Sequence, residues 1–343
     1  AADGLPAAPI QGLLFGGGGQ LWIATGNGLV RFDGGSFTTL TVDDGLSGNA
    51  ISCLAPAGGE ALWVGTPVGL TYYDGGTTRQ YGVEDGLAGN VINSLLVEAD
   101  GGLWVGSAGG VLSHIESGRV TQTLHLGDGG RDQVPISAIV EDGRGGRWIS
   151  TNFFGLFHDD GVSQTAYGGG VGPQGMRINA LLVDREGTLW VGTHESGLSR
   201  YEHGRLHSLR SGIELPETRV NDILQDRTGT MWFATDGDGL IRQSEEGQRV
   251  FNTTHGLSHN AVRALLAADD GTVWVGTEGG VCRLEGERCV ALNTPRALPV
   301  QTWDLMQDRS GARWIATQGR VARYQDGQYT LYGTDDGLIY GDV

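Results

Sequence analysis

The segment DREGTLWVGTHESGLSRY, residues 184–201, contains the pattern that decides the fold. It begins with a four-residue turn in which Asp184 can accept backbone amides and Gly187 tolerates a positive φ. Leu189 to Thr193 follows as a short strand. This stretch predicts the middle of a four-stranded antiparallel sheet with hairpin links, whose other strands are Ile178 to Val183, Gly197 to Tyr201 and Arg205 to Leu209.

The same tryptophan-centred phrase recurs along the whole chain, at Trp22, Trp63, Trp104, Trp148, Trp190, Trp232, Trp274 and Trp314. A four-stranded sheet of about 42 residues cannot bury both of its faces alone, so copies must stack, and radial stacking buries all of them. The repeat therefore predicts an all-β fold, a β-propeller of four-stranded antiparallel blades that forms one domain over residues 1–343. Eight phrases favour eight blades; the alternative is seven blades with a displaced extra repeat.

A small residue stands two positions after each tryptophan, as Gly192 does after Trp190. A side chain of this size lets neighbouring sheets approach closely, so we expect the next blade to pack against it.

Composition limits the classes of partner. Forty acidic and 23 basic residues give a net charge of −17, which repels nucleic acid. The 343 residues contain no apolar run near the roughly 20 needed to span a bilayer. We therefore expect no nucleic-acid partner.

Residues 184–201 and the related DRTGTMWFATDGDGLIRQ, residues 226–243, together with DDGL or EDGL between units, resemble the two-component-regulator propeller repeat. The resemblance covers essentially the entire chain. It implies the periplasmic sensor region of a hybrid histidine kinase or diguanylate cyclase, hence a periplasmic or extracellular part of an inner-membrane protein. It also implies a downstream output domain in the same protein and a homodimer. Because both ends of the sequence match the segment between units, we expect a piece of a longer signalling protein.

Candidate ligand-binding residues come from two sets of positions at one end of the blades. The position eleven residues before each tryptophan starts the inner strand and is polar or large, which suggests a channel mouth. Arg263 and Trp303 depart most from the others there, and are expected to clamp an anionic or aromatic ligand. The loops after the second strand vary between blades, as binding loops do. The predicted site residues are Asn93, Asn152, Phe153, Asn179, His194, Asn221, Arg263, Trp303 and Arg320.

Structural roles compete with ligand binding at these positions. The Ser and Asn members can cap strand starts or hydrogen-bond ordered water, and nearby acids can neutralise Arg263. The ligand itself is left open as a small molecule, a glycan or a peptide.

Three functions are compatible with these residues. The leading hypothesis is a sensor without catalysis. Streptogramin lyases are also propellers, and His194, Glu195 and Glu278 are the residues that a lyase would use here. The third hypothesis is a scaffold for protein contacts. No metal-spaced cluster is present, Asp236 and Asp238 offer too few ligands for Ca²⁺, and no cofactor is predicted.

Two of the three cysteines lie in one predicted hairpin. A turn at Glu285-Gly286 places Leu284 opposite Glu287 and Cys282 opposite Cys289, at a distance that allows a disulfide in an exported protein. Cys53, on a predicted inner strand, is expected to be a small buried hydrophobe.

Overall fold

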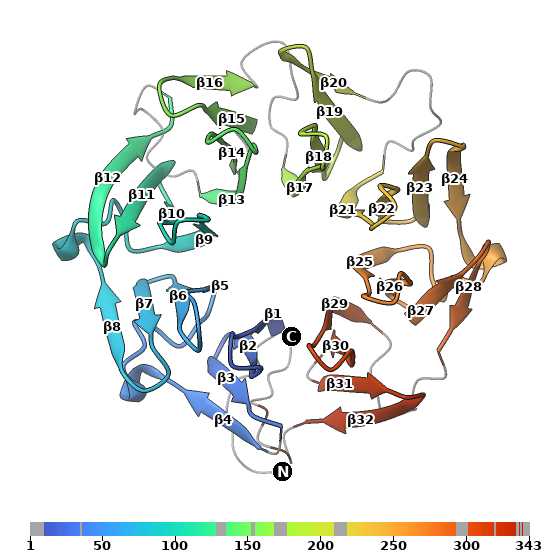
Figure 1. Cartoon of the computed structure of the whole chain (residues 1–343), viewed down its shortest axis with the longest axis horizontal. Helices are drawn as coiled ribbons and strands as arrows, with labels where there is room; N and C mark the ends of the chain where they lie inside the picture. Colours follow the sequence, from blue (N-terminus) through green and yellow to red (C-terminus); the bar gives the residue numbers. More distant parts are fainter. Residues whose placement is uncertain are drawn as a thin grey trace. The chain divides into compact units, whose positions relative to one another are not determined.

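The computed structural model is an all-β, eight-bladed propeller in which every blade is a four-stranded antiparallel sheet (Figure 1). The eight-bladed prediction is confirmed, and the seven-bladed alternative is wrong. The structure describes residues 10–34, 36–127, 135–151, 155–167, 177–208, 218–292, 301–318 and 320–333, with residues 336 and 338.

Each blade uses four consecutive strands, paired in chain order from the inner strand outward. The strands of the first four blades are β1 (Ile10–Phe15), β2 (Leu21–Thr25), β3 (Gly28–Phe32) and β4 (Phe37–Leu40); β5 (Cys53–Pro56), β6 (Leu62–Thr66), β7 (Gly69–Tyr73) and β8 (Thr78–Tyr81); β9 (Ile92–Val97), β10 (Leu103–Ser107), β11 (Val111–Glu116) and β12 (Arg119–His125); and β13 (Ile136–Glu141), β14 (Arg147–Thr151), β15 (Gly155–Asp159) and β16 (Gln164–Tyr167).

The other four blades follow the same plan. Their strands are β17 (Ile178–Val183), β18 (Leu189–Thr193), β19 (Leu198–Glu202) and β20 (Arg205–Ser208); β21 (Val220–Gln225), β22 (Met231–Thr235), β23 (Leu240–Ser244) and β24 (Gly247–Phe251); β25 (Val262–Ala267), β26 (Val273–Thr277), β27 (Gly280–Glu285) and β28 (Arg288–Ala291); and β29 (Thr302–Gln307), β30 (Arg313–Thr317), β31 (Arg320–Gln325) and β32 (Gln328–Tyr332).

Short 3₁₀ turns link some blades, at Val42–Asp44, Val83–Asp85 and Thr253–His255. The first ends at Gly45, whose φ of 96° is the left-handed conformation that glycine tolerates best. The side chain of Asn49 accepts a hydrogen bond from the Val42 amide at 2.9 Å and closes this turn. The recurring DGL sequence is therefore a turn signal.

The chain divides into two compact units. One contains Ala1–Ile139, Gln318–Arg323 and Thr330–Val343, and within it the inner strands β1, β5 and β9 are successive neighbours. The other contains Val140–Thr317 and Tyr324–Tyr329, and within it β17, β21, β25 and β29 are successive neighbours.

The repeated tryptophans belong to the core, and the acidic turn before them fixes several of their rings. All eight are at most 7% exposed. In the fifth blade, Asp184 accepts the backbone amides of Glu186 and Thr188 with one oxygen and the indole N–H of Trp190 with the other, at 2.7 Å. The turn residues thus link strand pairing to core packing.

Where the small residue two positions after the tryptophan is glycine, it lies against the inner strand of the next blade. A Cβ atom added to Gly192 would lie 2.7 Å from Cγ1 of Val220, and one added to Gly276 would lie 2.6 Å from Cγ2 of Thr302. Such distances are shorter than real Cβ contacts allow, so a larger side chain would push the blades apart. The predicted close approach is confirmed at these positions.

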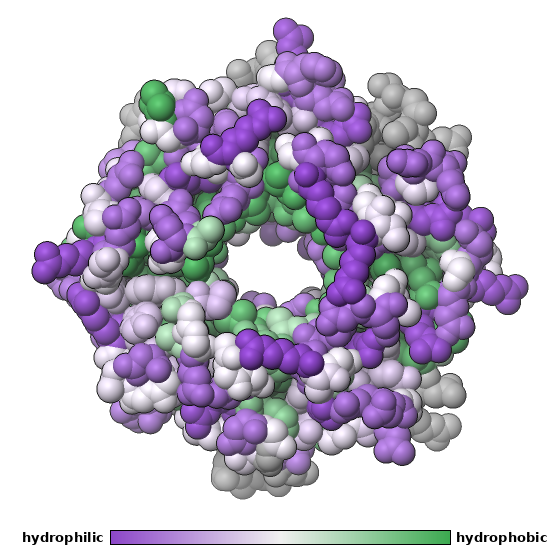
Figure 2. Space-filling model, viewed as in Figure 1, coloured by the Kyte–Doolittle hydropathy of each residue, from purple (hydrophilic) through white to green (hydrophobic). Residues whose placement is uncertain are grey.

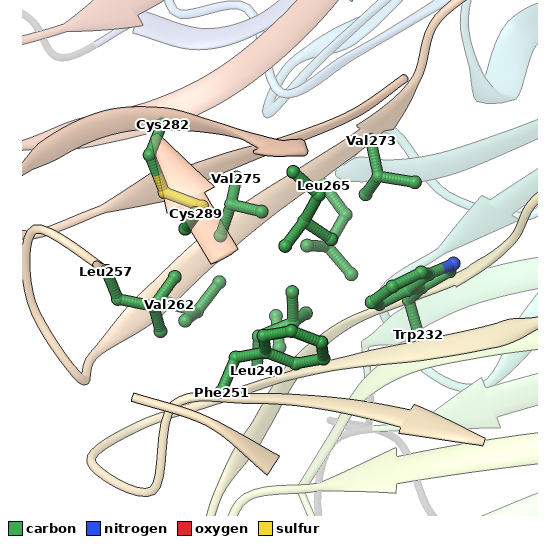
Figure 3. Close-up of a cluster of buried hydrophobic side chains, with 12 residues drawn as sticks. Trp232, Leu240, Phe251, Leu257, Val262, Leu265, Val273, Val275, Cys282 and Cys289 are labelled. Carbon is green, nitrogen blue, oxygen red and sulfur yellow. A yellow bond between two sulfur atoms is a disulfide. The ribbon is translucent and has the colours of Figure 1, made fainter. Parts of the chain in front are cut away.

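Between the sixth and seventh blades, apolar side chains from both sheets form one cluster (Figure 3). Trp232, Leu240 and Phe251 from one blade pack with Val262 and Val275 from the next. The face of the molecule seen in Figure 2 is largely hydrophilic.

Cys282 and Cys289 form a disulfide at the edge of this cluster, with their Cα atoms 5.7 Å apart (Figure 3). The predicted register of the hairpin is wrong by two residues, because Gly286 and Glu287 form the turn and Glu285 pairs with Arg288. Leu284 therefore faces Cys289, and the disulfide runs diagonally. A shift of two residues keeps side chains on the same face of a sheet, so the two sulfur atoms still meet.

Candidate functional site

The predicted position eleven residues before the tryptophan is a β-bulge in six of the blades whose strand pairing the structure describes. Between Val262 and Ala264, for example, the pairing of β25 with β26 skips Arg263. A bulge leaves its extra residue outside the ladder and redirects its side chain, and bulges are common next to functional sites. The other bulged residues are Gln11, Asn93, Asn179, Asn221 and Trp303.

Several polar members of this set hold neighbouring blades together. Nδ2 of Asn179 donates to the Val220 carbonyl at 3.1 Å, and Nδ2 of Asn221 donates to the Val262 carbonyl at 2.7 Å. Nδ2 of Asn93 instead donates to the Val91 carbonyl of its own blade, at 3.4 Å. These contacts give Asn179 and Asn221 a structural role; ligand binding by the three asparagines stays a prediction.

Arg263 lies in a network of charged side chains, here called the Arg263 network. The network lies at the end of the blades where loops join the second strand to the third. Its guanidinium forms an ion pair with Glu278 and lies 3.7 Å from a carboxylate oxygen of Asp236. Asp236 also lies 3.8 Å from the guanidinium of Arg219, and His259 Nδ1 lies 3.9 Å from Glu278. The hydrogen bond from Arg263 holds the pKa of Glu278 below its usual value.

The acidic side chains of this network neutralise Arg263, which is the structural role that competed with ligand binding in the sequence analysis. The members of the network remain partly exposed. The side chain of Arg263 is 18% exposed and that of Glu278 is 32% exposed. Trp303, at the same bulge position on the neighbouring strand β29, is 42% exposed. A paired cation beside an exposed indole suits a ligand that carries both hydrogen-bonding groups and a flat surface.

His194, another predicted residue, has its ion-pair partner outside this network. Nδ1 of His194 pairs with the adjacent Glu195 at 3.1 Å, whereas Glu278 pairs with Arg263. Arg320 begins β31. Asn152 and Phe153 lie outside the described residues.

The opposite end of the blades contains a site that the sequence analysis missed. In the fourth blade, Oδ2 of Asp142 accepts a hydrogen bond from Nε2 of His158 at 2.8 Å, in the place where Asp184 binds the indole N–H of Trp190. Burial opposes ionisation of Asp142, but hydrogen bonds from His158 and from two backbone amides hold its pKa below the usual value. The imidazole lies against Trp148, with ring centroids 4.2 Å apart and ring planes tilted by 31°.

A sequence signal for this site exists. Arginine stands ten residues after the tryptophan in the fifth and sixth blades, as Arg200 does after Trp190, but His158 holds that position in the fourth. Blade three has the same exchange at His114, whose Nε2 lies 2.7 Å from Glu98.

The first unit contains an aromatic-lined cleft of about 570 Å³ between its second and third blades. Trp63, Tyr72 and Tyr81 contribute rings, and the guanidinium of Arg79 lies 4.6 Å from the centre of the Tyr81 ring. This volume is in the range of small-molecule pockets.

Metal and membrane features are not found among the residues that the structure describes. No three His, Cys, Asp or Glu side chains there gather as a metal site would require, and no helix there has the length and apolarity needed to cross a membrane.

Comparison with known proteins identifies the repeat. Residues 86–109, 172–195, 214–237 and 256–279 match the family model described as "Two component regulator propeller". No curated protein matches the sequence.

Solved structures share the fold. The extracellular domain of the hybrid two component system BT3049 from B. thetaiotaomicron is 18% identical with a TM-score of 0.58, over 96% of this chain and 53% of that domain. A streptogramin B lyase is 13% identical with a TM-score of 0.58, over 96% of both chains. The computationally designed Ika8 protein is 14% identical with a TM-score of 0.64, over 96% of this chain and 98% of that one.

These likenesses show a common fold and leave function open, since sensor domains and lyases both appear among them. The chain spans about half the length of the BT3049 domain.

Proposed function

Because the chain carries two component regulator propeller repeats, we propose that it is the extracytoplasmic ligand-recognition propeller of a bacterial signal-transduction protein, with no catalysis of its own. The repeat match is the observation that carries this proposal, since it is a likeness of sequence as well as of fold. The likeness to the extracellular BT3049 domain agrees with it.

The disulfide supports an extracytoplasmic location. Cys282 and Cys289 are bonded, and such bonds persist in oxidising compartments but are reduced in the bacterial cytosol.

The charged network around Arg263 and the exposed Trp303 are the proposed recognition surface. A small molecule, glycan or peptide would stack on Trp303 and exchange hydrogen bonds with Arg263, Glu278 and Asp236. Binding would change the packing between two protomers, or the seating of an output domain in the same protein, and so bias a two-state output.

A thermal-shift screen tests this proposal. The purified chain is heated with neutral and acidic oligosaccharides, tripeptides and aromatic acids, and hits are repeated with Arg263→Gln and Trp303→Ala. We expect at least one compound to raise the melting temperature of the native protein, and both variants to lose that shift. A shift that both variants retain would exclude this surface, and a panel with no hit at millimolar concentration would count against recognition.

Among the residues that the structure describes, no contact favours the lyase alternative. His194 and Glu278 have separate partners, Glu195 and Arg263. A turnover assay on a streptogramin B, with EDTA and a His194→Ala variant as comparisons, distinguishes the two functions. Metal-dependent turnover that His194→Ala abolishes would replace the sensor proposal.

A further inference from the structure

A second cleft, of about 610 Å³, lies between the fourth and fifth blades. It is lined by the turns that join the first strand to the second and the third strand to the fourth in both blades. These turns lie at the end of the blades opposite the Arg263 network, so the cleft opens there. Trp148, His158 and Asp142 form one wall, and Tyr201 and Glu202 form the other.

Trp148 has an unused donor in this cleft. In the fifth, sixth and eighth blades the indole N–H is bonded to the turn aspartate, at 2.7 to 2.9 Å. In the fourth blade His158 takes that oxygen of Asp142, and no described residue accepts from the Trp148 indole. Trp148 is only 4% exposed but lines the cleft, so a carbonyl of a ligand that enters the cleft can accept from this N–H.

His158 has an unused nitrogen as well. Its Nε2 is held by Asp142, and within the described ranges nothing pairs with its Nδ1. With the proton on Nε2, Nδ1 is an acceptor. His114 in the third blade differs, because its Nδ1 lies 3.3 Å from both Thr121 Oγ1 and Glu116. The free acceptor is therefore particular to the fourth blade.

The cleft lining is negative. Four carboxylates, those of Asp142, Asp160, Glu186 and Glu202, line the cleft with one guanidinium, that of Arg144. Oε1 of Glu202 also pairs with Arg200 of its own blade, at 2.6 Å, so an arriving cation would share this carboxylate. The net charge of −17 on the chain adds to the attraction for cations.

Aromatic rings complete the lining. The ring of Tyr201 meets Trp148 edge to face with centroids 4.5 Å apart, and its hydroxyl lies 2.9 Å from that of Tyr167, which fixes its orientation. Arginine on an aromatic face is a recurrent arrangement in this chain, since Arg200 lies 5.4 Å from the centre of the Trp190 ring.

We propose that this cleft binds an arginine side chain of a peptide or protein partner. The guanidinium donates to His158 Nδ1 and to Glu202 and lies against Tyr201, while a backbone carbonyl of the same partner accepts from the Trp148 indole. Arginine suits the cleft better than lysine because its planar group has five donors and stacks on rings. This site is separate from the Arg263 surface.

Indole NMR tests the proposal directly. The probe is acetyl-Gly-Ala-Arg-Ala-Gly-amide, and its comparison is the same peptide with citrulline, which keeps the shape but removes the charge. Among the indole signals of the nine tryptophans, the one lost in Trp148→Phe belongs to Trp148. We expect the arginine peptide to shift this signal saturably, and citrulline to weaken binding about tenfold.

Variants locate the contact. Glu202→Gln should weaken binding about threefold, and 0.5 M salt should weaken it further. Glu245→Gln is the matched control, because Glu245 lines the neighbouring cleft between the fifth and sixth blades and should leave binding unchanged.

Three outcomes would overturn the proposal: equal binding of the citrulline peptide, shifts at other indoles but not at Trp148, or no saturable shift. If Trp148→Phe does not fold, the indole signal that His158→Gln moves most provides the assignment. If the Arg263 surface binds no ligand, the result of this test does not change.

Discussion

Nδ2 of Asn221 lies 2.7 Å from the carbonyl oxygen of Val262, so a side chain of the sixth blade is hydrogen-bonded to the inner strand of the seventh. Asn221 is the bulged residue of β21. The bulge therefore serves packing between blades, because it turns a polar group toward a neighbouring backbone acceptor.

Replacing this donor should destabilise the protein. Asn221→Ala leaves the Val262 carbonyl unpaired and is expected to lower the free energy of unfolding by about 1–2 kcal/mol. Urea denaturation followed by tryptophan fluorescence measures the change. Asn93→Ala is the control and should cost less, because its longer contact stays within one blade. Equal losses in the two variants would contradict the role assigned to Asn221.

Close packing of blades depends on glycine two residues after tryptophan. In Gly192→Ala the new methyl group would lie 2.7 Å from Val220, and we expect a loss of about 1–3 kcal/mol in unfolding free energy. Gly12→Ala is the matched control, because a Cβ there meets no atom within 4 Å. Thermal unfolding of both variants checks the difference, and an unchanged midpoint in Gly192→Ala would refute it.

The ion pair between Arg263 and Glu278 should be visible in a titration. Arg263→Gln removes the hydrogen bond that lowers the pKa of Glu278, so this pKa should rise toward its usual value. The native pair stabilises the fold above the unfolded pKa and loses its contribution as pH falls through the folded pKa, so the variant should lose stability less steeply in acid. Carboxyl NMR measures both. Arg283→Gln, whose partner is Glu285, should leave Glu278 unchanged.

Asp222 gives the opposite pH dependence. Burial raises its pKa to about 7, against hydrogen bonds from the amides of Leu265 and Ile223 and with a smaller contribution from Asp304. Because the unfolded pKa is near 3.9, the folded state holds the extra proton between about pH 4 and 7, and stability should fall as pH rises through this window. Asp222→Asn should flatten that slope in thermal melts. A slope that persists in the variant would assign it to another group.

The cysteines can be counted. Without reductant, denatured protein should show one reactive thiol, that of Cys53, and after reduction it should show three. The double substitution of Cys282 and Cys289 by serine should lower the free energy of unfolding by about 2–3 kcal/mol, which urea denaturation measures. Three thiols in protein isolated from the periplasm would contradict the exported location.

The blade plan is predictable from sequence because its determinants are local and occur eight times. Asp184 and Gly187 specify a turn, and Gly192 specifies a close contact, without reference to distant residues. The hairpin at Cys282 is different, since the choice of Gly286 and Glu287 as turn residues decides the register and depends on packing that the sequence does not display.

The candidate sites were less predictable, because each depends on which of several possible side chains forms the hydrogen bond or ion pair. Arg263 stands out in the sequence, but its pairing with Glu278 and Asp236 follows from how neighbouring loops meet. At Trp148, His158 stands where other blades have an arginine and takes one oxygen of Asp142, so that no residue in the described part of the chain accepts from the indole. The sequence shows the exchange of arginine for histidine, but only the structure shows which oxygen of Asp142 it engages.

Equivalent positions make the contacts between blades in more than one place. One is the bulged asparagine that donates to the inner strand of the next blade, and the other is the glycine that packs against that strand. Blades that carry both residues thus present the same contacts to the blade that follows. A duplication or exchange of one 42-residue module would therefore preserve these contacts while the turns and clefts beside it diverge.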